Sequence, residues 1–230
     1  MSTFHILNGD CLAEKFPKNL EGESIIWREA LIDGPVSDNN FFENRKRFIA
    51  ENYDLESDYD ELVVKEFQKM QNIPEDSDVF FWFEDDLFCQ VNFWFLISNL
   101  NLGKTKIFRV FPKDTEKGFS ESEENDLLEL FHSAKEINDT ERKLISNLWI
   151  DFQQNNLSKG SSSEIVRNLE ELITANENRF NGTLENQIKD IQKTAESFEE
   201  VFKIFNQKYP VYGFGDLQLK RYIDQFLDYS

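Results

Sequence analysis

The residues best suited to chemistry in this sequence are charged side chains that directly follow short apolar runs. After the run at residues 79–83, three carboxylates come in succession, Glu84, Asp85 and Asp86. Short unbroken apolar runs are typical of buried strands, and the carboxyl ends of parallel strands meet at one edge of a sheet. Two further runs end near charged residues: Asp10, Arg28 and Glu29. We therefore expect these side chains to converge at that edge.

Carboxylates that converge in this way are suited to a divalent cation. Mg²⁺ and Mn²⁺ prefer oxygen ligands in proteins and commonly serve phosphoryl chemistry. The predicted metal ligands are Asp10, Glu84 and Asp85. Arg28 would then hold an anionic group of the ligand through two parallel hydrogen bonds.

A histidine and a glutamine complete the candidate site. His5 lies in the first apolar run, shortly before Asp10, where a general-base role is open to it. Gln90 lies one helical turn after Asp86 and could hydrogen-bond a ligand or Asp10. The candidate catalytic residues are His5, Asp10, Arg28, Glu29, Glu84 and Gln90.

All of these residues also have a structural interpretation. A carboxylate after a strand often caps the following helix, and an adjacent arginine is often its ion-pair partner. A lone histidine inside a strand is more often a hydrogen-bonded core residue than a catalyst. Gln90 could equally satisfy backbone groups that would otherwise be buried without a partner. At the level of the sequence, both interpretations stay open.

Familiar catalytic and cofactor-binding motifs are absent from the sequence. There is no P-loop, no G-x-G-x-x-G fingerprint and no G-x-S-x-G nucleophile elbow. The two histidines, His5 and His132, and the two cysteines, Cys11 and Cys89, form no zinc-binding pattern. The sequence therefore assigns no reaction to the candidate residues.

Composition narrows the class of protein. The 230 residues carry a net charge of −19, which argues against binding to the nucleic-acid backbone and indicates a solvated surface. Two cysteines are too few for a disulfide scaffold, and Cys89 lies in an apolar run where a small buried residue is expected. The first residues do not resemble a secretion signal, and no apolar run is long enough to span a bilayer. We expect a cytoplasmic protein that does not enter a membrane.

Alternation of short strands with helical segments predicts an α/β fold. Helices are expected within residues 39–72 and at residues 87–101, where Asp85 or Asp86 would cap the first turn and Gly103 would end the helix. The expected strands are residues 3–7, 24–27, 79–83 and 106–111. We predict a Rossmann-like, mostly parallel sheet with flanking helices over residues 1–115.

From Ser120 onward the sequence predicts helices and no strand. Residues 116–230 would form an all-helical C-terminal region, which a serine-rich, linker-like segment at residues 158–163 could divide. Helices are expected to start near polar residues: Ser122, Asp139 or Thr140, Ser163, Thr183, Ser197 and Asp216.

Three segments, in order, resemble the signature blocks of a bacterial family called domain of unknown function 1835. They are residues 5–10 (HILNGD), 27–35 (WREALIDGP) and 81–92 (FWFEDDLFCQVN). The third block of that family usually resembles W-F-E-H-D-L-F-x-Q, so Asp85 stands where histidine is frequent. Two later segments, RFNGTLENQI and GFGDLQLKRYI, are similar to the helical part that often accompanies the domain.

The resemblance covers about the first half of the chain and implies no activity, because the family has no established one. It implies which positions are worth testing. The residues that match the family blocks are His5, Gly9, Asp10, Trp27, Arg28, Glu29, Asp33, Gly34, Pro35, Glu84, Asp86 and Gln90.

Two functions of different classes follow from these observations. The first is an enzyme or binding protein for a small phosphate-bearing or nucleotide-like ligand, with a solvent-reached polar cluster at the strand ends. The second is a non-catalytic regulatory or protein-interaction protein, in which the same groups are buried and satisfy one another. A DNA-binding regulator with a winged-helix-like C-terminal region is a further alternative, against which the acidic charge and the lack of a basic helix face argue.

Overall fold

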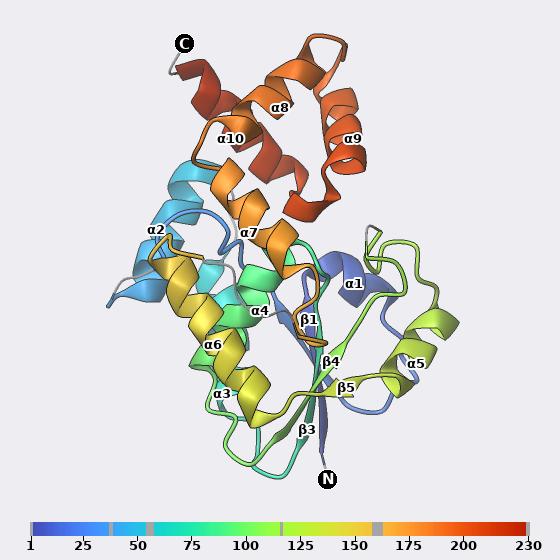
Figure 1. The fold of residues 1–230 in the computed structure, drawn as a ribbon. Helices are drawn as coiled ribbons and strands as arrows, with labels where there is room; N and C mark the ends of the chain where they lie inside the picture. Colours follow the sequence, from blue (N-terminus) through green and yellow to red (C-terminus); the bar gives the residue numbers. More distant parts are fainter. Residues whose placement is uncertain (1, 37–38, 54–57, 116, 158–162, 229–230) are drawn as a thin grey trace.

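A five-stranded, mostly parallel sheet forms the centre of the protein (Figure 1). The computed structural model describes residues 2–36, 39–53, 58–115, 117–157 and 163–228. The strand order is β2-β1-β3-β4-β5; the first four strands are parallel, and β5 is antiparallel to β4. The strands are β1 (Thr3–Asn8), β2 (Glu23–Trp27), β3 (Asp78–Trp82), β4 (Lys106–Val110) and β5 (Lys135–Glu136).

Helices cover both faces of the sheet, as an α/β fold requires (Figure 1). One face is covered by α1 (Asp10–Lys15) and α5 (Glu124–His132), whose apolar residues pack with Leu7, Trp82 and Val110. The opposite face is covered by α2 (Phe41–Tyr53), α3 (Lys65–Gln71) and α4 (Leu87–Asn99), and α6 (Asp139–Gln153) packs on the outer side of α4. A π-helical segment, η1 (Asp60–Val64), leads directly into α3.

The central strand and the helix that follows it are the most deeply buried part of the chain. β3 lies between β1 and β4, and its residues Val79 and Phe81 are fully buried. Helix α4 is apolar on nearly every side because it lies between the sheet and α6. The Asp86 side chain caps α4 by accepting the backbone N–H of Cys89 at 2.9 Å, which confirms one of the two expected caps.

The C-terminal region is helical and lies beyond the carboxyl ends of the parallel strands (Figure 1). Its apolar side chains belong to the same core as those of α4, so one continuous core joins the two parts. The helices are α7 (Leu169–Asn178), α8 (Thr183–Gln192), α9 (Phe198–Lys208), the short 3₁₀ helix η2 (Pro210–Tyr212) and α10 (Asp216–Asp228).

Several expected element boundaries differ from the structure. The prediction that no strand follows Ser120 is wrong, because β5 pairs with β4 for two residues. Elements that pack on the sheet or pair with it therefore extend past residue 115, through α5 to β5. Helix α4 ends at Asn99, before Gly103, and α7 begins at Leu169. Most of the expected linker, residues 158–162, lies outside the described residues.

Local hydrogen bonds explain two of the displaced helix starts. Asn138 caps α6, because its side chain accepts the N–H of Glu141 while the Glu141 carboxylate accepts the N–H of Asn138. Ser163 instead accepts the N–H groups of Ile165 and Val166 and closes a turn.

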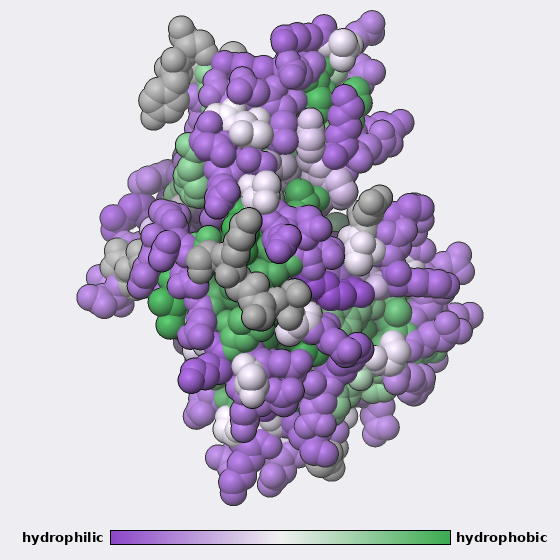
Figure 2. Space-filling model, viewed as in Figure 1, coloured by the Kyte–Doolittle hydropathy of each residue, from purple (hydrophilic) through white to green (hydrophobic). Residues whose placement is uncertain are grey.

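The surface is largely hydrophilic, as expected for a chain with so many acidic residues. On the face drawn in Figure 2, hydrophilic residues cover most of the molecule, and hydrophobic residues show in separate areas. Among the described residues, none of the helices has both the length and the apolar character needed to cross a bilayer.

Candidate functional site

The sheet topology creates a crevice beyond the carboxyl ends of β1 and β3. From β1 the chain continues through α1 to β2 on one side, and it then returns through α2 and α3 to β3 on the other side. The connections thus leave β1 and β3 in opposite directions. In open α/β sheets, this switch point is where ligands bind.

Two adjoining cavities lie at this switch point. The larger has a volume of about 490 Å³ and is bordered mainly by apolar side chains, and the smaller has a volume of about 340 Å³. They border the same turn between β1 and α1, at Gly9, and a Cβ atom built at Gly9 would meet nothing within 4 Å. The lining residues common to both are Asn8, Gly9, Asp10, Cys11, Phe88 and Gln218.

Glu29, at the end of β2, is a buried structural anchor. Its carboxylate forms an ion pair with Arg45 at 2.6 Å, and neither side chain is exposed. It also accepts the hydroxyl of Tyr59 and the N–H of Ala30. The charge of Glu29 is therefore already neutralised, which is the structural role that the sequence left open for it.

Asp85 is likewise committed to ion pairs. Its carboxylate contacts Arg109 on β4 at 2.9 Å and also binds Arg167, which precedes α7. The Asp85 side chain is 1% exposed, and Arg109 is fully buried. Arg167 also lies over the ring of Phe111. These contacts attach the C-terminal region to the end of β3.

Asp10 and Arg28 pair with each other at the rim of the larger cavity. The Arg28 Nε lies 2.9 Å from both oxygens of Asp10, and an Nη2–Oδ1 contact of 2.8 Å completes the pair. Asp10 is 57% exposed and Arg28 is 22% exposed. Both side chains are thus reached by solvent, but Arg28 is already paired with a carboxylate of the protein itself, that of Asp10.

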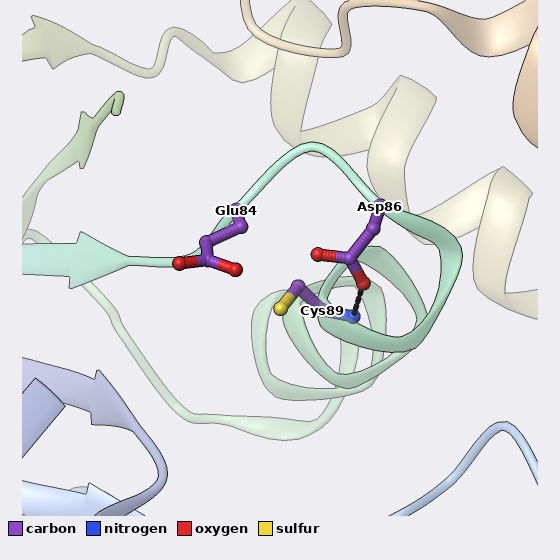
Figure 3. Close-up of side chains that lie close together, drawn as sticks. All are labelled: Glu84, Asp86 and Cys89. Atoms are coloured by element: carbon purple, nitrogen blue, oxygen red, sulfur yellow. Dashed lines mark hydrogen bonds between the residues drawn. The ribbon is translucent and has the colours of Figure 1, made fainter. Parts of the chain in front are cut away.

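Glu84 and Asp86 differ from the other carboxylates because they have no cationic partner. Within the described residues, no basic side chain forms an ion pair with either of them. Lys15 borders the same cavity, but its ammonium donates to the backbone carbonyls of Phe119 and Ser120. Figure 3 shows the carboxylates of Glu84 and Asp86 turned toward each other, with the thiol of Cys89 between them.

Two backbone segments close over this pair. The carboxylate of Glu84 accepts the N–H of Phe119, and a Cβ atom on Gly118 would overlap it. A Cβ atom on Gly213, which precedes α10, would overlap the carboxylate of Asp86. The absence of side chains at these glycines lets the two segments approach, and their φ angles of 60° and 65° favour glycine as well.

Burial and mutual repulsion change the acidity of the pair. Burial, and then the nearby charge of Asp86, raise the pKa of Glu84 from 4.5 to about 7. Burial likewise raises the pKa of Asp86, against the hydrogen bonds from Cys89 that lower it. Glu84 can therefore exchange a proton near neutral pH, which is the property required of a general acid or base.

Cys89 borders the pair and is held by a chain of amides. The Leu31 N–H and Glu29 carbonyl orient Asn92, and Asn92 donates to the side-chain oxygen of Asn8 at 3.1 Å. The Asn8 amide nitrogen therefore points to the sulfur of Cys89, 3.0 Å away. Burial, followed by the charges of Asp86 and Glu84, raises the pKa of the Cys89 thiol, so it is protonated at neutral pH.

The predicted metal ligands are not brought together. Asp85 lies in its arginine pairs, and Asp10 binds Arg28, so neither joins Glu84. The side chains that do converge are Glu84, Asp86 and Cys89, with potential ligand atoms all within 4.8 Å of one another. A thiol beside two carboxylates suits a borderline metal such as Zn²⁺ better than Mg²⁺ or Mn²⁺, which prefer oxygen alone.

His5 and Gln90 lie apart from the two cavities. His5 is fully buried in β1 among aromatic rings, and burial lowers its pKa, so the imidazole is neutral. Its Nδ1 accepts the indole N–H of Trp82, and Nε2 bonds the carbonyl of Glu21. Gln90 donates to the backbone carbonyl of Glu84, and its side-chain oxygen has no partner among the described residues. Both residues take the structural roles that the sequence allowed.

Sequence reasoning missed several residues that border the smaller cavity. Cys89 could have been found, because a residue three positions after a helix cap lies beside the capping side chain. Lys15, Gly118, Gly213 and Gln218 carry no such signal, since they come from segments whose position relative to β3 depends on the tertiary structure.

Comparison of the chain with protein-family models, with curated proteins and with solved structures gave no match. The resemblance to domain of unknown function 1835 therefore stays a prediction, and the geometry of the chain alone carries the functional argument.

Proposed function

We propose that this protein binds a small molecule in the two adjoining cavities at the carboxyl ends of β1 and β3. The observation that carries the proposal is the pair of half-buried Glu84 and buried Asp86 at the switch point, which borders the smaller cavity and forms no ion pair within the described residues. Burial of an ionised carboxylate without a cation is costly, and such groups are concentrated at functional sites. A ligand that supplies hydrogen-bond donors or positive charge would offset that cost.

The segments that carry the family resemblance also support a ligand site at the two cavities. The blocks at residues 5–10, 27–35 and 81–92 include the ends of β1, β2 and β3, which surround the two cavities. Segments far apart in the sequence thus meet around one crevice. If the chain belongs to that family, the crevice is where its activity would reside.

A nucleotide-like ligand could bind in these two cavities only together with a divalent cation. Its base would occupy the larger cavity, where apolar and aromatic side chains offer a stacking surface. Its phosphates would meet Glu84 and Asp86, which repel a bare anion. A phosphate-bearing ligand therefore requires a divalent cation between its phosphates and these carboxylates.

The proposal includes a chemical role for one residue. With a pKa of about 7, Glu84 can both accept and donate a proton in the neutral range, so it is the residue through which an enzyme at this site would act. Asp86 would keep Glu84 partly protonated by charge repulsion, as in other carboxylate pairs.

The interaction-protein hypothesis rests on a specific observation too. Glu29 and Asp85 are buried and satisfied within the chain, as that hypothesis expects of strand-end carboxylates. It offers no reason for the unpaired Glu84 and Asp86, so we place it second. The winged-helix alternative gains no support, because residues 163–228 of the described chain contain no strand that could form a wing.

Cys11 provides a direct test of occupancy. It is exposed and borders both cavities, whereas Cys89 is buried. A thermal-shift screen with nucleotides, sugar phosphates, nucleosides and small amines, each with and without Mg²⁺, Mn²⁺ or Zn²⁺, would find ligands, since binding to the native state raises the melting temperature. A ligand at the proposed site must also slow the alkylation of Cys11.

Glu84→Gln and Glu14→Gln form the matched pair of variants for this screen. Glu14 is an exposed acid on α1 that borders neither cavity. The proposal expects loss of the ligand effect in Glu84→Gln only. A ligand that raises the melting temperature while Cys11 reacts at its usual rate binds elsewhere and contradicts the proposal.

A further inference from the structure

We propose that the ligand of this site has an apolar, ring-sized body in the larger cavity and an ammonium head beside Glu84 and Asp86 in the smaller one. This inference rests on the proposed function and names the chemical class of its ligand. It follows from the side-chain groups in each cavity that no ion pair or hydrogen bond within the protein already occupies.

The larger cavity offers apolar surface and no unpaired charge. Its two charged groups besides Asp10 are already paired, Arg28 with Asp10 and Glu29 with Arg45. Its tyrosine hydroxyls are also committed, that of Tyr59 to Glu29 and that of Tyr53 to Asp33. The rest of the lining is mainly apolar: Trp27, Ala30, Ile49, Leu62, Val63, Phe88 and Leu217. Asn8 and Gln218 add side-chain amides, and the buried indole N–H of Trp27 has no partner among the described residues. A hydrophobic ring-sized group fits this lining and volume.

The smaller cavity offers acceptors and excess negative charge. Glu84 and Asp86 have no cationic partner within the described residues, and the ammonium of Lys15 is held by two backbone carbonyls. The carboxylates accept backbone N–H bonds, from Phe119 to Glu84 and from Cys89 to Asp86, and the Cys89 thiol also hydrogen-bonds Asp86. An ammonium group supplies three donors and a positive charge, which complements this lining.

The two cavities are close enough for one ligand to occupy both. They share the turn at Gly9, Asp10 and Cys11 as a common border, and the space above Gly9 is open. Phe88, on the first turn of α4, borders both cavities from the other side. A short linker between ring and ammonium can therefore pass over Gly9.

An organic ammonium fits better than a bound metal ion at this position. A metal ligated by Glu84, Asp86 and Cys89 would compete with the cap bond that Asp86 accepts and with the bond from Asn8 to the Cys89 sulfur. It would also require ionisation of a buried thiol. An ammonium requires neither change, because it can donate to the lone pairs of the two carboxylates that the chain leaves free.

Isothermal calorimetry with matched ligand pairs tests the inference on the full chain. Tryptamine is compared with 3-(indol-3-yl)propanoate, and 2-phenylethylamine with 3-phenylpropanoate, so that each pair differs only in its head group, an ammonium or a carboxylate. We expect each amine to bind at least about tenfold more tightly than its acid, a ratio that corresponds to about 1.4 kcal/mol. Each amine should also slow the alkylation of Cys11.

Variants separate the carboxylate pair from general acidity. Glu84→Gln should weaken amine binding by about tenfold or more, while Glu14→Gln should leave it unchanged. Circular dichroism of Glu84→Gln confirms that the variant is folded. A second folded variant, Asp86→Asn, keeps a side-chain oxygen for the cap and should weaken binding in the same direction.

The outcomes distinguish this inference from the proposed function. Equal or tighter binding of the acids, or amine binding that survives in both carboxylate variants, overturns the ammonium head. Failure of both amines to bind at millimolar concentration overturns it too. If a nucleotide with Mg²⁺ then protects Cys11, the proposed function stands without this inference. If no bound ligand protects Cys11, the proposed function itself fails.

Discussion

Neighbouring carboxylates of the same type have opposite roles in this protein. Asp85 is neutralised by Arg109 and Arg167, whereas Asp86 caps α4 and forms no ion pair in the part of the chain that the structure describes. Glu84 resembles Asp86, because it too is covered by the chain without an ion pair. At the scale of residues, the site is thus defined by which carboxylates are left without a cation.

The raised pKa of Glu84 predicts how the stability of the folded protein depends on pH. In the unfolded chain this carboxyl has a pKa near 4.5, and in the folded protein it rises to about 7. The folded state therefore binds more protons between these values, so the free energy of unfolding falls as pH rises from about 4.5 to 7. We expect Glu84→Gln to remove a penalty on the order of 3 kcal/mol at pH 8 and none below about pH 4.

Urea unfolding of the parent and of Glu84→Gln at a series of pH values measures this difference. Glu14→Gln, which changes an exposed acid, should unfold like the parent throughout. The groups that face Glu84 are Asp86, Asp85, Lys15 and Cys89. Because burial raises the pKa of Asp86 as well, we expect Asp86 to titrate together with Glu84. If Glu84→Gln is no more stable than the parent at pH 8, the carboxyl is not held in a costly ionised state.

At the scale of elements, the site is closed by two segments that are not adjacent in the sequence. The segment at Gly118 lies against Glu84, and the turn at Gly213 lies against Asp86. The turn at Gly213 belongs to the C-terminal region, which also contributes Leu217 and Gln218 to the cavity lining. The helical region therefore borders the proposed site.

Gly213→Ala tests the close approach of this turn to Asp86. The φ of Gly213 is 65°, so an alanine there is strained, and its Cβ would also overlap the Asp86 carboxylate. Gly182→Ala is the matched control, because its φ is 83° but its Cβ would meet nothing within 4 Å. We expect both variants to lose about 1 kcal/mol to strain and Gly213→Ala to lose at least about 1 kcal/mol more. If chemical denaturation shows that both variants lose the same free energy of unfolding, the turn at Gly213 does not lie in close contact with Asp86.

Asp33 attaches the C-terminal helices to the end of β2. It accepts the hydroxyls of Tyr53 and Tyr222, and it forms ion pairs with Arg221 at 3.2 Å and Arg179 at 3.5 Å. Asp33→Asn leaves two half-buried guanidinium groups without their anion, which should cost about 2 kcal/mol, less than the loss of a fully buried partner. Hydrogen exchange should accelerate more in α7 and α10 than in β1 and β3.

Asp190→Asn is the control for this experiment. Asp190 pairs with Lys193 on the surface, where both side chains are more than two-thirds exposed. An exposed pair contributes little, so this variant should exchange like the parent. Uniform acceleration across the whole chain in Asp33→Asn would mean that the helices do not open separately from the sheet.

At the scale of the whole molecule, an excess of negative charge surrounds the hydrophobic cores on the two faces of the sheet. The net charge is −19, and the view in Figure 2 shows a mostly hydrophilic surface. Repulsion among exposed carboxylates opposes the compact state and is screened by salt. We expect the melting temperature to rise by roughly 3 °C between about 0.02 M and 0.2 M NaCl, which corresponds to about 1 kcal/mol in a domain of this size. Differential scanning calorimetry that finds no rise would mean that surface ion pairs already balance this repulsion.

The strands and the central helix could be predicted because their signals are local. The four apolar runs became β1 to β4, and Asp86 caps α4 as a carboxylate after a strand often does. β5 was missed because a two-residue strand has too few side chains to show a period, and it exists only because β4 offers a free edge. Candidate site residues were found at the correct edge of the sheet, but not all of them belong together.

The sequence by itself determined the α/β class, the position of the strand ends and the pool of carboxylates found there, because apolar periodicity and capping act over a few residues. Only the tertiary structure decided which of those carboxylates are available. Asp85 finds its partners 24 and 82 residues away, and Gly213 approaches Asp86 from the far end of the chain. Charge neutralisation and burial depend on such distant contacts, so the distinction between anchor and site appears only in the folded protein.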